Sequence, residues 1–362
     1  MKLVTIVGAR PQFIKASPFS AEFRKHNQEI LVHTGQHYDE NMSEVFFDEL
    51  SIPRPDYNLG VGSGSHGQQT AKMLEGIENI LLDEKPDGLL AYGDTNSTLA
   101  GALAASKLHI PVYHVEAGLR SYNKIMPEEQ NRVLTDHISD LLLCPTETAV
   151  SNLRKEGVID GVVNTGDIMY DAVLNNISIS EHKYSGGKWV DEIRGDNGSI
   201  SETDKYYLAT IHRAENTDDP SKLSIIFEAF ASFDKPVILP LHPRTKKLIK
   251  SIEINTKNVI IIEPVGYLLM LYLTSNAYMV ITDSGGLQKE AYFLKTPCTT
   301  LRDQTEWVET LGNEWNVLSR INANEIRSAI RRELTCLSYP QPKTFGDGNA
   351  SIKICNAILN GG

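Results

Sequence analysis

The chain repeats one pattern along most of its length: a short apolar run, a turn of polar or glycine residues, and a longer stretch with helical spacing. Runs such as Gly88 to Tyr92 are short, apolar and bounded by turn residues, which is typical of buried parallel strands. The alternation predicts an α/β fold built on doubly wound parallel sheets. The apolar runs interpreted as strands are 3–7, 29–34, 88–92, 111–115, 140–144, 161–166, 206–211, 236–241, 259–262 and 278–282.

One stretch interrupts this alternation, from about Ser178 to Asp204, where the chain is polar, glycine-containing and without clear period. We expect the domain boundary near this stretch and assign residues 1–170 to an N-terminal domain and 171–346 to a C-terminal domain. A final helix is predicted over 347–360, because Ile352, Cys355 and Ile358 have helical spacing, and we expect it to pack back on the first domain. A chain of 362 residues is long enough for two such cores.

Composition narrows the class of protein. Apolar residues make up 41% and charged residues 22%, as in ordinary globular proteins. The net charge of −11 argues against nucleic acid or an anionic membrane surface as a partner, so local cations must hold any anionic ligand. We expect a cytoplasmic protein without a signal peptide, because a strand follows Met1 almost directly, no apolar run approaches membrane-spanning length, and no CxxC pair occurs. The cysteines are Cys144, Cys298, Cys336 and Cys355.

Three carboxylates stand where an apolar run stops and a turn or helix begins: Asp94, Glu116 and Glu128. In an open α/β sheet the carboxyl ends of the strands are where ligands bind. Acids gathered there suggest proton transfer. Asp94 and Glu128 have an alternative role as helix caps, which acids fill well. Glu116 follows a largely apolar strand directly and has no obvious packing role.

The turn after the first strand lacks the G-x-G-x-x-G pattern of dinucleotide loops. It offers Arg10 and Lys15 instead, which suit a phosphate or a polar sugar, unless they are simply solvated surface cations. After the second strand, His37 is a site candidate by position only. The Gly/Ser-rich residues 58–67 form either a mobile active-site loop or a passive connector.

In the second half, polar groups again follow each strand, among them His212 and His242. The Ser284-Gly285-Gly286 turn enters a helix, so its free backbone N–H groups and the helix dipole suit an anion, although a plain tight turn would also use two glycines. No HExxH motif or Cys/His cluster occurs, and we predict neither a metal nor another cofactor. His109 and His114 fit structural roles better than metal ligation.

Taken together, several motifs resemble those of the non-hydrolysing UDP-N-acetylglucosamine 2-epimerases. The resemblance runs in order over nearly the whole chain. It implies two Rossmann-like domains facing across a cleft, the GT-B-like arrangement of one large class of glycosyltransferases, and a homodimer. The motifs are GARPQFIK at 8–15, GDTNSTLAG at 93–101, HVEAGLRS at 114–121, MPEEQNR at 126–132, IHRAEN at 211–216 and TDSGGLQKEA at 282–291.

The resemblance also implies a reaction and a site. The family inverts carbon 2 of the sugar without a redox cofactor, by eliminating UDP to a glycal-like intermediate and adding it back. The matching catalytic positions are Asp94, Glu116, Glu128 and His212. The matching UDP contacts are Arg10, Arg132, Ser284, Gly285, Gly286 and Glu290, to which we add Lys15 and His242 as substrate-binding candidates.

The favoured hypothesis is therefore an isomerase that interconverts UDP-N-acetylglucosamine and its manno epimer, or a modified UDP-2-acetamido sugar, for surface polysaccharide. Residues 301–309, LRDQTEWVE, resemble the family branch that acts on modified sugars. Two alternatives are a glycosyltransferase on the same architecture and a UDP-sugar-binding regulator without turnover. Three acids at one sheet edge favour the enzyme, because a binding module does not need them.

Overall fold

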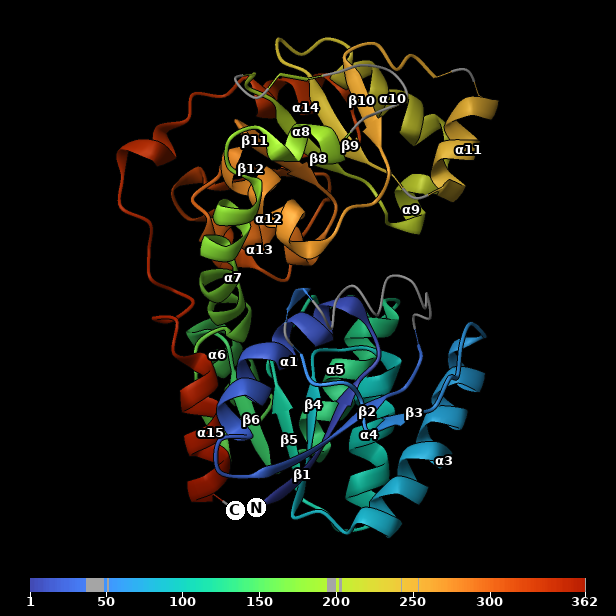
Figure 1. The fold of residues 1–362 in the computed structure, drawn as a ribbon, viewed down its shortest axis with the longest axis vertical. Coiled ribbons are helices and arrows are strands. Elements are labelled where there is room, and N and C mark those ends of the chain that lie inside the picture. The colour runs from blue at the N-terminus through green and yellow to red at the C-terminus, as the bar shows by residue number, and fades with distance from the viewer. Residues whose placement is uncertain are drawn as a thin grey trace. The chain divides into compact units, whose positions relative to one another are not determined.

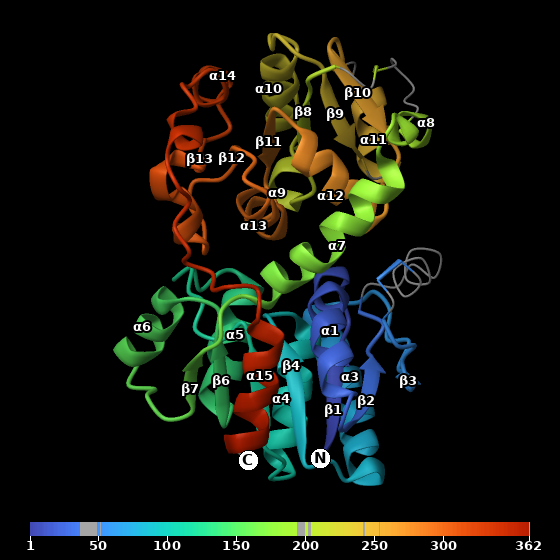
Figure 2. The same ribbon diagram turned by 60° about the vertical axis from the view of Figure 1, so that its left-hand side comes forward.

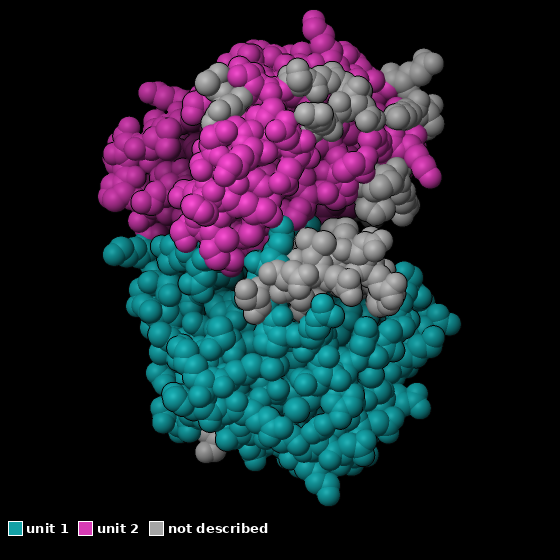
Figure 3. All heavy atoms as spheres, in the orientation of Figure 1, with its two compact units in different colours: residues 1–175, 343–362 teal, residues 176–342 magenta. Residues whose placement is uncertain are grey.

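The computed structural model describes residues 1–36, 49–50, 52–193, 200–201, 204–241, 243–252 and 254–361. They form two compact units, coloured separately in Figure 3. Unit 1 comprises Met1–Asn175 and Lys343–Gly362, and unit 2 comprises Asn176–Pro342.

The first part of the polar stretch after Ser178 is helical, which its composition does not indicate. It completes helix α7 (Ile168–Tyr184), inside which the chain passes from unit 1 to unit 2, and it contains α8 (Lys188–Glu192). Tyr184 and Trp189 are buried in the unit 2 core. A few large apolar side chains therefore anchor these helices where the overall pattern predicts irregular structure.

Unit 1 is built on a seven-stranded parallel sheet in the order β3-β2-β1-β4-β5-β6-β7; Figure 1 labels β1 to β6, and Figure 2 labels β7. The strand order reverses beside β1, which pairs with both β2 and β4. This is a doubly wound sheet, and its ligand crevice is expected where the order reverses. The strands are β1 Lys2–Val7, β2 Gln28–His33, β3 Tyr57–Asn58, β4 Gly88–Tyr92, β5 Val112–Val115, β6 Leu141–Cys144 and β7 Val162–Asn164.

Helices cover both faces of this sheet (Figure 2). α3 packs on α4 and α4 on α5, whereas α1 packs against α15. The strands between the edge strands β3 and β7 are buried on both sides, which explains their continuous apolar character. The helices are α1 Arg10–Phe23, α3 His66–Glu84, α4 Asn96–Lys107, α5 Pro127–Ile138, α6 Glu147–Lys155 and α15 Ala350–Gly361.

The C-terminal helix α15 is fastened to α7 at its first turn. The Asp171 carboxylate of α7 accepts hydrogen bonds from the backbone N–H groups of Ala350 (3.0 Å) and Ser351 (2.8 Å). These N–H groups have no partner within their own helix, so Asp171 acts as a cap supplied by another segment. Ile354 and Ile358 then bury one face of α15.

Unit 2 repeats the architecture with six parallel strands in the order β10-β9-β8-β11-β12-β13. One face packs on α10 and α14 and the other on α12 and α13. Among the described residues, no helix combines the length and apolar character needed to cross a bilayer.

The strands of unit 2 are β8 Tyr207–Thr210, β9 Val237–Pro240, β10 Val259–Ile262, β11 Met279–Thr282, β12 Cys298–Thr300 and β13 Asn316–Leu318. Its further helices are α9 Ala214–Thr217, α10 Pro220–Phe230, α11 Pro243–Ser251, α12 Tyr267–Asn276, α13 Gly285–Phe293, α14 Ala323–Ile330, and the 3-10 helices Val308–Glu314 and Thr335–Ser338.

Candidate active site

In unit 1 the candidate site lies at the carboxyl ends of β1 and β4, where the strand order reverses. Gln12 of α1 joins the two turns that follow these strands. Its Oε1 accepts from the Gly8 N–H (2.8 Å), and its Nε2 donates to the Tyr92 carbonyl (2.7 Å). The turns after β1 and β4 are thereby held together by a buried amide, which was not among the sequence-derived candidates.

Lys15 and Glu116 form an ion pair inside unit 1. Lys15 lies on α1 and Glu116 follows β5, so two segments 101 residues apart supply one site. The side chains are only 9% and 8% exposed. A buried charge pair of this kind is costly to desolvate, and breaking it by removing one partner is strongly unfavourable. Lys15 is therefore a buried partner of a candidate acid and not a solvated surface cation.

The backbone of Glu116 is in the left-handed region, with φ +73°. A non-glycine residue adopts this conformation only at a cost of roughly 1–2 kcal/mol, unless its surroundings fix it. The N–H groups of Glu116 (3.0 Å) and Ala117 (3.3 Å) both donate to the Leu143 carbonyl. The turn after β5 thus aims the carboxylate toward Lys15.

Gly93 is required beside this pair. A Cβ on Gly93 would lie 3.2 Å from Glu116 Oε2 and 3.6 Å from Lys15 Nζ, and its φ of +66° favours glycine. The ion pair therefore lies directly against the turn after β4, which continues into Asp94.

Asp94 is paired with the buried guanidinium of Arg132 on α5. The Asp94 side chain is 29% exposed, whereas that of Arg132 is 4% exposed. The cap of α4 is Thr95, whose hydroxyl accepts from the Thr98 N–H, so Asp94 is not the capping residue. Its carboxylate remains partly accessible and is oriented by a cation.

Glu128 and its neighbour Glu129 have different environments. Glu128 lies in the first turn of α5 and is exposed, where a carboxylate interacts favourably with the helix dipole. Glu129 is buried and accepts from Arg132 Nη1 (2.7 Å) and from the N–H groups of Ser121 and Tyr122 (2.9 and 2.7 Å). Glu129 was missed as a site residue because the sequence offered two adjacent acids and no burial to separate them.

The remaining candidates of the first half of the chain are Arg10, His37 and the Gly/Ser-rich stretch. Arg10 is the first residue of α1 and is partly buried. His37 lies outside the described residues. The Gly/Ser-rich stretch connects β3 to α3, which begins at His66.

In unit 2 the equivalent strand ends are those of β8 and β11, and Asp283 joins them. Its carboxylate accepts from the N–H groups of His212 (3.1 Å) and Arg213 (3.1 Å) and from Asn216 Nδ2 (3.0 Å). Asp283 is completely buried. It lies within the TDSGGLQKEA motif, but a buried anchor could not be told apart there from a ligand-facing acid.

His212 is oriented by the same carboxylate. Its Nδ1 lies 2.9 Å from Asp283 Oδ1, while its side chain is 59% exposed. Burial alone would raise the pKa of Asp283, but the hydrogen bonds from His212, Asn216 and Arg213 outweigh it and hold that pKa below the ordinary value. His212 is therefore fixed on one side by an ionised acid and presents its other ring nitrogen to solvent.

The Ser284-Gly285-Gly286 turn begins α13. Ser284 is the N-cap, and its hydroxyl accepts from the Leu287 N–H (3.3 Å). A Cβ on Gly285 would lie 2.6 Å from Glu306 Oε1, so any other residue there would have to displace this buried carboxylate. Glu306 is held by Arg302 (3.0 Å). The turn combines free helix N–H groups with a close-packed wall, as an anion site requires.

Two further charges lie on α13 behind this turn. Glu290 is 7% exposed and Lys289 only 1% exposed. Lys289 Nζ lies 3.6 Å from the centre of the Trp307 ring, a cation–π contact that partly offsets its burial. His242 lies outside the described residues.

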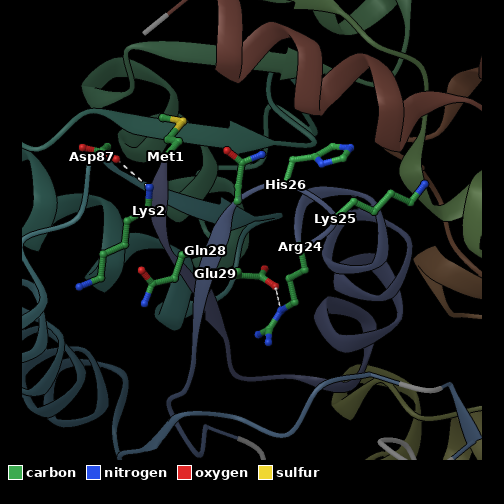
Figure 4. A pocket seen from close by; sticks show the side chains of 9 residues that line it. Met1, Lys2, Arg24, Lys25, His26, Gln28, Glu29 and Asp87 are labelled. Atoms are coloured by element: carbon green, nitrogen blue, oxygen red, sulfur yellow. Dashed lines mark hydrogen bonds and ion pairs between the residues drawn. The ribbon is translucent and has the colours of Figure 1, made fainter.

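The structure thus brings Lys15, Asp94, Glu116 and Arg132 together in unit 1, and His212 with the Ser284-Gly285-Gly286 turn in unit 2. Among the described residues, no group of three or more His, Cys, Asp or Glu side chains could hold a metal ion. A shallow hollow of about 800 Å³ lies elsewhere in unit 1, beside Lys2, Arg24 and Glu29 (Figure 4). Its cations are already paired, Arg24 with Glu29 and Lys2 with Glu84, so it carries none of the candidate chemistry.

Comparison with known proteins gives a consistent assignment. The model of the UDP-N-acetylglucosamine 2-epimerase family matches residues 21–359. A Methanococcus maripaludis UDP-N-acetylglucosamine 2-epimerase homolog is 54% identical over 99% of this chain and 100% of its own length. A UDP-2,3-diacetamido-2,3-dideoxy-D-glucuronate 2-epimerase of Pseudomonas aeruginosa is 48% identical over 99% of both chains.

Solved structures show the same similarity. The Methanocaldococcus jannaschii UDP-GlcNAc 2-epimerase in complex with UDP-GlcNAc and UDP superposes with a TM-score of 0.89 at 44% identity, covering 100% of both chains. These structures confirm the fold class of two parallel-sheet units with helices on both sides of each sheet.

Proposed function

The chain belongs to the UDP-N-acetylglucosamine 2-epimerase family, and from this premise we propose that it inverts carbon 2 of a UDP-2-acetamido sugar by eliminating UDP and adding it back. It is an isomerase. The observation that carries the proposed mechanism is the buried Lys15–Glu116 pair against the Gly93 turn, with the Asp94–Arg132 pair beside it in the sequence.

The chemistry explains why such groups are needed. The proton on carbon 2 of an acetamido sugar is not acidic, so direct removal is difficult. As UDP leaves, oxocarbenium-like positive charge develops on carbon 1. Because carbon 2 is its neighbour, the proton on carbon 2 becomes easier to remove. The reaction therefore needs a group that takes the proton, a group that returns one to the other face, and cations or N–H donors for the diphosphate.

Glu116 is the proposed proton acceptor. Its pairing with Lys15 favours the ionised carboxylate, which is the form that can take a proton. Asp94, partly exposed and oriented by Arg132, is the proposed second acid, with Glu128 at the exposed start of α5 as a third. The three acids differ in burial and in the cation that accompanies them.

Unit 2 supplies the proposed diphosphate contacts. The N–H groups of Gly285 and Gly286, in the first turn of α13, suit a phosphate oxygen, and exposed His212 can donate to another. Glu290 is proposed for the ribose hydroxyls, whereas Arg10 and His242 are proposed as further substrate contacts. The M. jannaschii relative was solved with UDP-GlcNAc and UDP, which supports this ligand class.

The proposal includes a cellular setting. All four cysteines are free, buried thiols, which suits a reducing cytoplasm. The product serves as a precursor of surface polysaccharide in this proposal. We also propose a homodimer, for which exposed apolar side chains such as Leu134 and Leu82 offer contact area. Light scattering on the purified protein measures its mass directly and tests the dimer.

The proposed function is tested by incubation with UDP-sugars in deuterated water without an acceptor. A panel should contain UDP-N-acetylglucosamine and UDP-2,3-diacetamido-glucuronate. We expect an epimer with one deuterium at carbon 2, measured by mass spectrometry, and a preferred sugar that identifies the substrate. Epimer without deuterium would contradict proton exchange at carbon 2, and binding without any epimer would favour a regulator.

A glycosyltransferase would give a different result. It would leave the sugar configuration unchanged and release UDP only when an acceptor is added. Comparing reactions with and without acceptor glycans therefore separates this alternative from the epimerase.

A further inference from the structure

His114 lies in the centre of β5 and is completely buried in unit 1. Both of its ring nitrogens have close partners. Nδ1 lies 2.7 Å from Asp136 Oδ1 on α5, and Nε2 lies 2.7 Å from the carbonyl oxygen of Gly93. A residue in a strand thus connects a helix to the turn that carries Asp94.

The two partners fix which atoms carry protons. A backbone carbonyl oxygen can only accept, so Nε2 must donate to Gly93. Asp136 also accepts from the Gly118 N–H (3.1 Å) and Arg120 Nη1 (2.6 Å), as an ionised carboxylate does. Nδ1 must then donate as well. A neutral imidazole has one N–H group, whereas this geometry uses two.

We propose that His114 is held as an imidazolium and is a positioning residue: it fixes the Gly93–Asp94 turn and, through Gly93, the Glu116 carboxylate. The catalytic part of this inference rests on the proposed epimerase function. His114 contacts neither substrate nor reacting atoms in this scheme. It acts through the backbone on the groups that do.

The surrounding charges balance. Asp136 faces two cations, His114 and Arg120, and Arg120 in turn makes two bonds to Glu156 (2.7 and 2.8 Å). Two positive and two negative groups thus form one network. Burial by itself would raise the pKa of Asp136, but the hydrogen bonds and charges of His114 and Arg120 outweigh it and hold that pKa below the ordinary value.

Other titratable groups near the network do not upset this balance. His137 lies 3.2 Å from Glu156 at the exposed end of the network. Cys144 of β6 interacts electrostatically with Asp136 and Arg120, but burial raises the pKa of its thiol, so the thiol stays neutral. On the far side of Gly93, Lys15 and Glu116 neutralise each other.

The network acts on the site through Gly93. The Gly93 N–H donates to the Val115 carbonyl (3.0 Å), and the Gly93 carbonyl accepts from His114, so the peptide groups on both sides are fixed. The same glycine lies against the Glu116 carboxylate and directly precedes Asp94. Losing the His114 bond frees this turn at the point where two candidate acids meet.

The first test is the protonation state, which needs no activity. NMR of protein labelled with ¹⁵N in its 10 histidines distinguishes imidazolium from neutral imidazole, and His114→Gln assigns the signal by its loss. We expect both nitrogens of His114 to be protonated at about pH 7.5, where exposed histidines are neutral. In Asp136→Asn, which keeps the shape but removes the charge, this signature should disappear. A wild-type His114 with one unprotonated nitrogen would overturn the proposal.

The second test separates positioning from binding. For His114→Gln we expect kcat to fall by roughly 10–100-fold, because small displacements of catalytic groups are costly. KM and UDP affinity should stay within about twofold, since the contacts proposed for the diphosphate are in unit 2. Exposed His109→Asn, in the loop before the same strand, is the matched control and should leave kcat unchanged. Unchanged kcat in His114→Gln would exclude the positioning role.

Two outcomes are kept apart by this design. If the wild type epimerises no UDP-sugar, the proposed function fails, while NMR still decides the state of His114. If His114→Gln does not fold, as the absence of a cooperative denaturant transition would show, Asp136→Asn replaces it. That variant should lower kcat with KM unchanged, and an unchanged kcat there would contradict the proposal.

Discussion

Unit 1 and unit 2 place an acid at the same point of the same topology and use it differently. Asp94 follows β4 and Asp283 follows β11, each beside the first strand of its sheet. Asp94 is 29% exposed and is paired with one cation, whereas Asp283 is fully buried and is occupied by His212, Arg213 and Asn216. Asp94 is thus partly accessible to a ligand, whereas Asp283 holds the residues around it in place.

The difference extends to the rest of each site. Unit 1 presents paired charges, Lys15 with Glu116 and Arg132 with Asp94, which suits proton transfer. Unit 2 presents backbone N–H groups at a helix start and one exposed imidazole, which suits anion binding. Topology thus gives the position of a site, and the local partners of each acid decide what it can do.

The largest effect is expected for Glu116→Gln, which keeps the shape and removes the titratable group. We expect turnover to fall at least roughly 100-fold, the usual scale for acid–base catalysis, with UDP affinity nearly unchanged. Steady-state kinetics and calorimetry with UDP measure the two quantities. Equal losses of turnover and UDP affinity would show that units 1 and 2 do not divide the work in this way.

His212→Asn tests the other side of the comparison. We expect UDP affinity to fall by roughly 10–100-fold along with turnover, because a hydrogen bond to a charged ligand contributes about 1.5–3 kcal/mol. Calorimetry with UDP is the measurement. Full UDP affinity in this variant would remove His212 from the diphosphate site.

Gly285→Ala probes the wall of the anion-binding turn. Its Cβ would lie 2.6 Å from Glu306 Oε1, so we expect an unfolding free energy lower by about 1–3 kcal/mol and weaker UDP binding. Gly286→Ala is the matched control, because its Cβ would meet nothing closer than Ser284 Oγ at 3.8 Å. The measurement is denaturant unfolding of both variants. Identical unfolding curves for Gly285→Ala and Gly286→Ala would refute the close contact.

The smallest effect concerns acid stability. Asp136 and Asp283 have pKa values below the ordinary 3.8 in the folded protein. Their contribution to stability is therefore complete above that value and is lost as pH falls toward the lower folded values. We expect denaturant midpoints to drop below about pH 4 and the drop to be smaller in Asp283→Asn. An equal drop in wild type and variant would contradict the role of Asp283.

More of the fold than of the candidate site could be predicted from the sequence. The strand Gly88–Tyr92 is read directly from its apolar run, because buried parallel strands have a simple pattern. The segment after Ser178 could not, since Tyr184 and Trp189 anchor its helices within a polar composition. A hydrophobic pattern reflects the average environment of a segment. Two large buried side chains can hold a segment in a helix even when its other residues are polar.

Several features of the candidate site could not be predicted from the sequence. Strand ends indicated Asp94 and Glu116, but the choice between Asp94 and Thr95 as helix cap needs backbone geometry. Glu128 and Glu129 are adjacent acids with opposite exposure, which only the packing of α5 separates. A structural role for His114 was expected from its place in a buried strand, but its second acceptor, Gly93, is 21 residues away and is not visible in any local motif.

The discontinuity of unit 1 has a consequence for synthesis on the ribosome. Residues 176–342 form unit 2, whereas α15 is synthesised after them and belongs to unit 1. Until α15 emerges, Asp171 lacks the amides of Ala350 and Ser351, and α1 lacks the helix that packs against it. All residues of unit 2 are therefore synthesised before the helix that completes unit 1, so unit 1 cannot make its full set of contacts until unit 2 has left the ribosome's active centre.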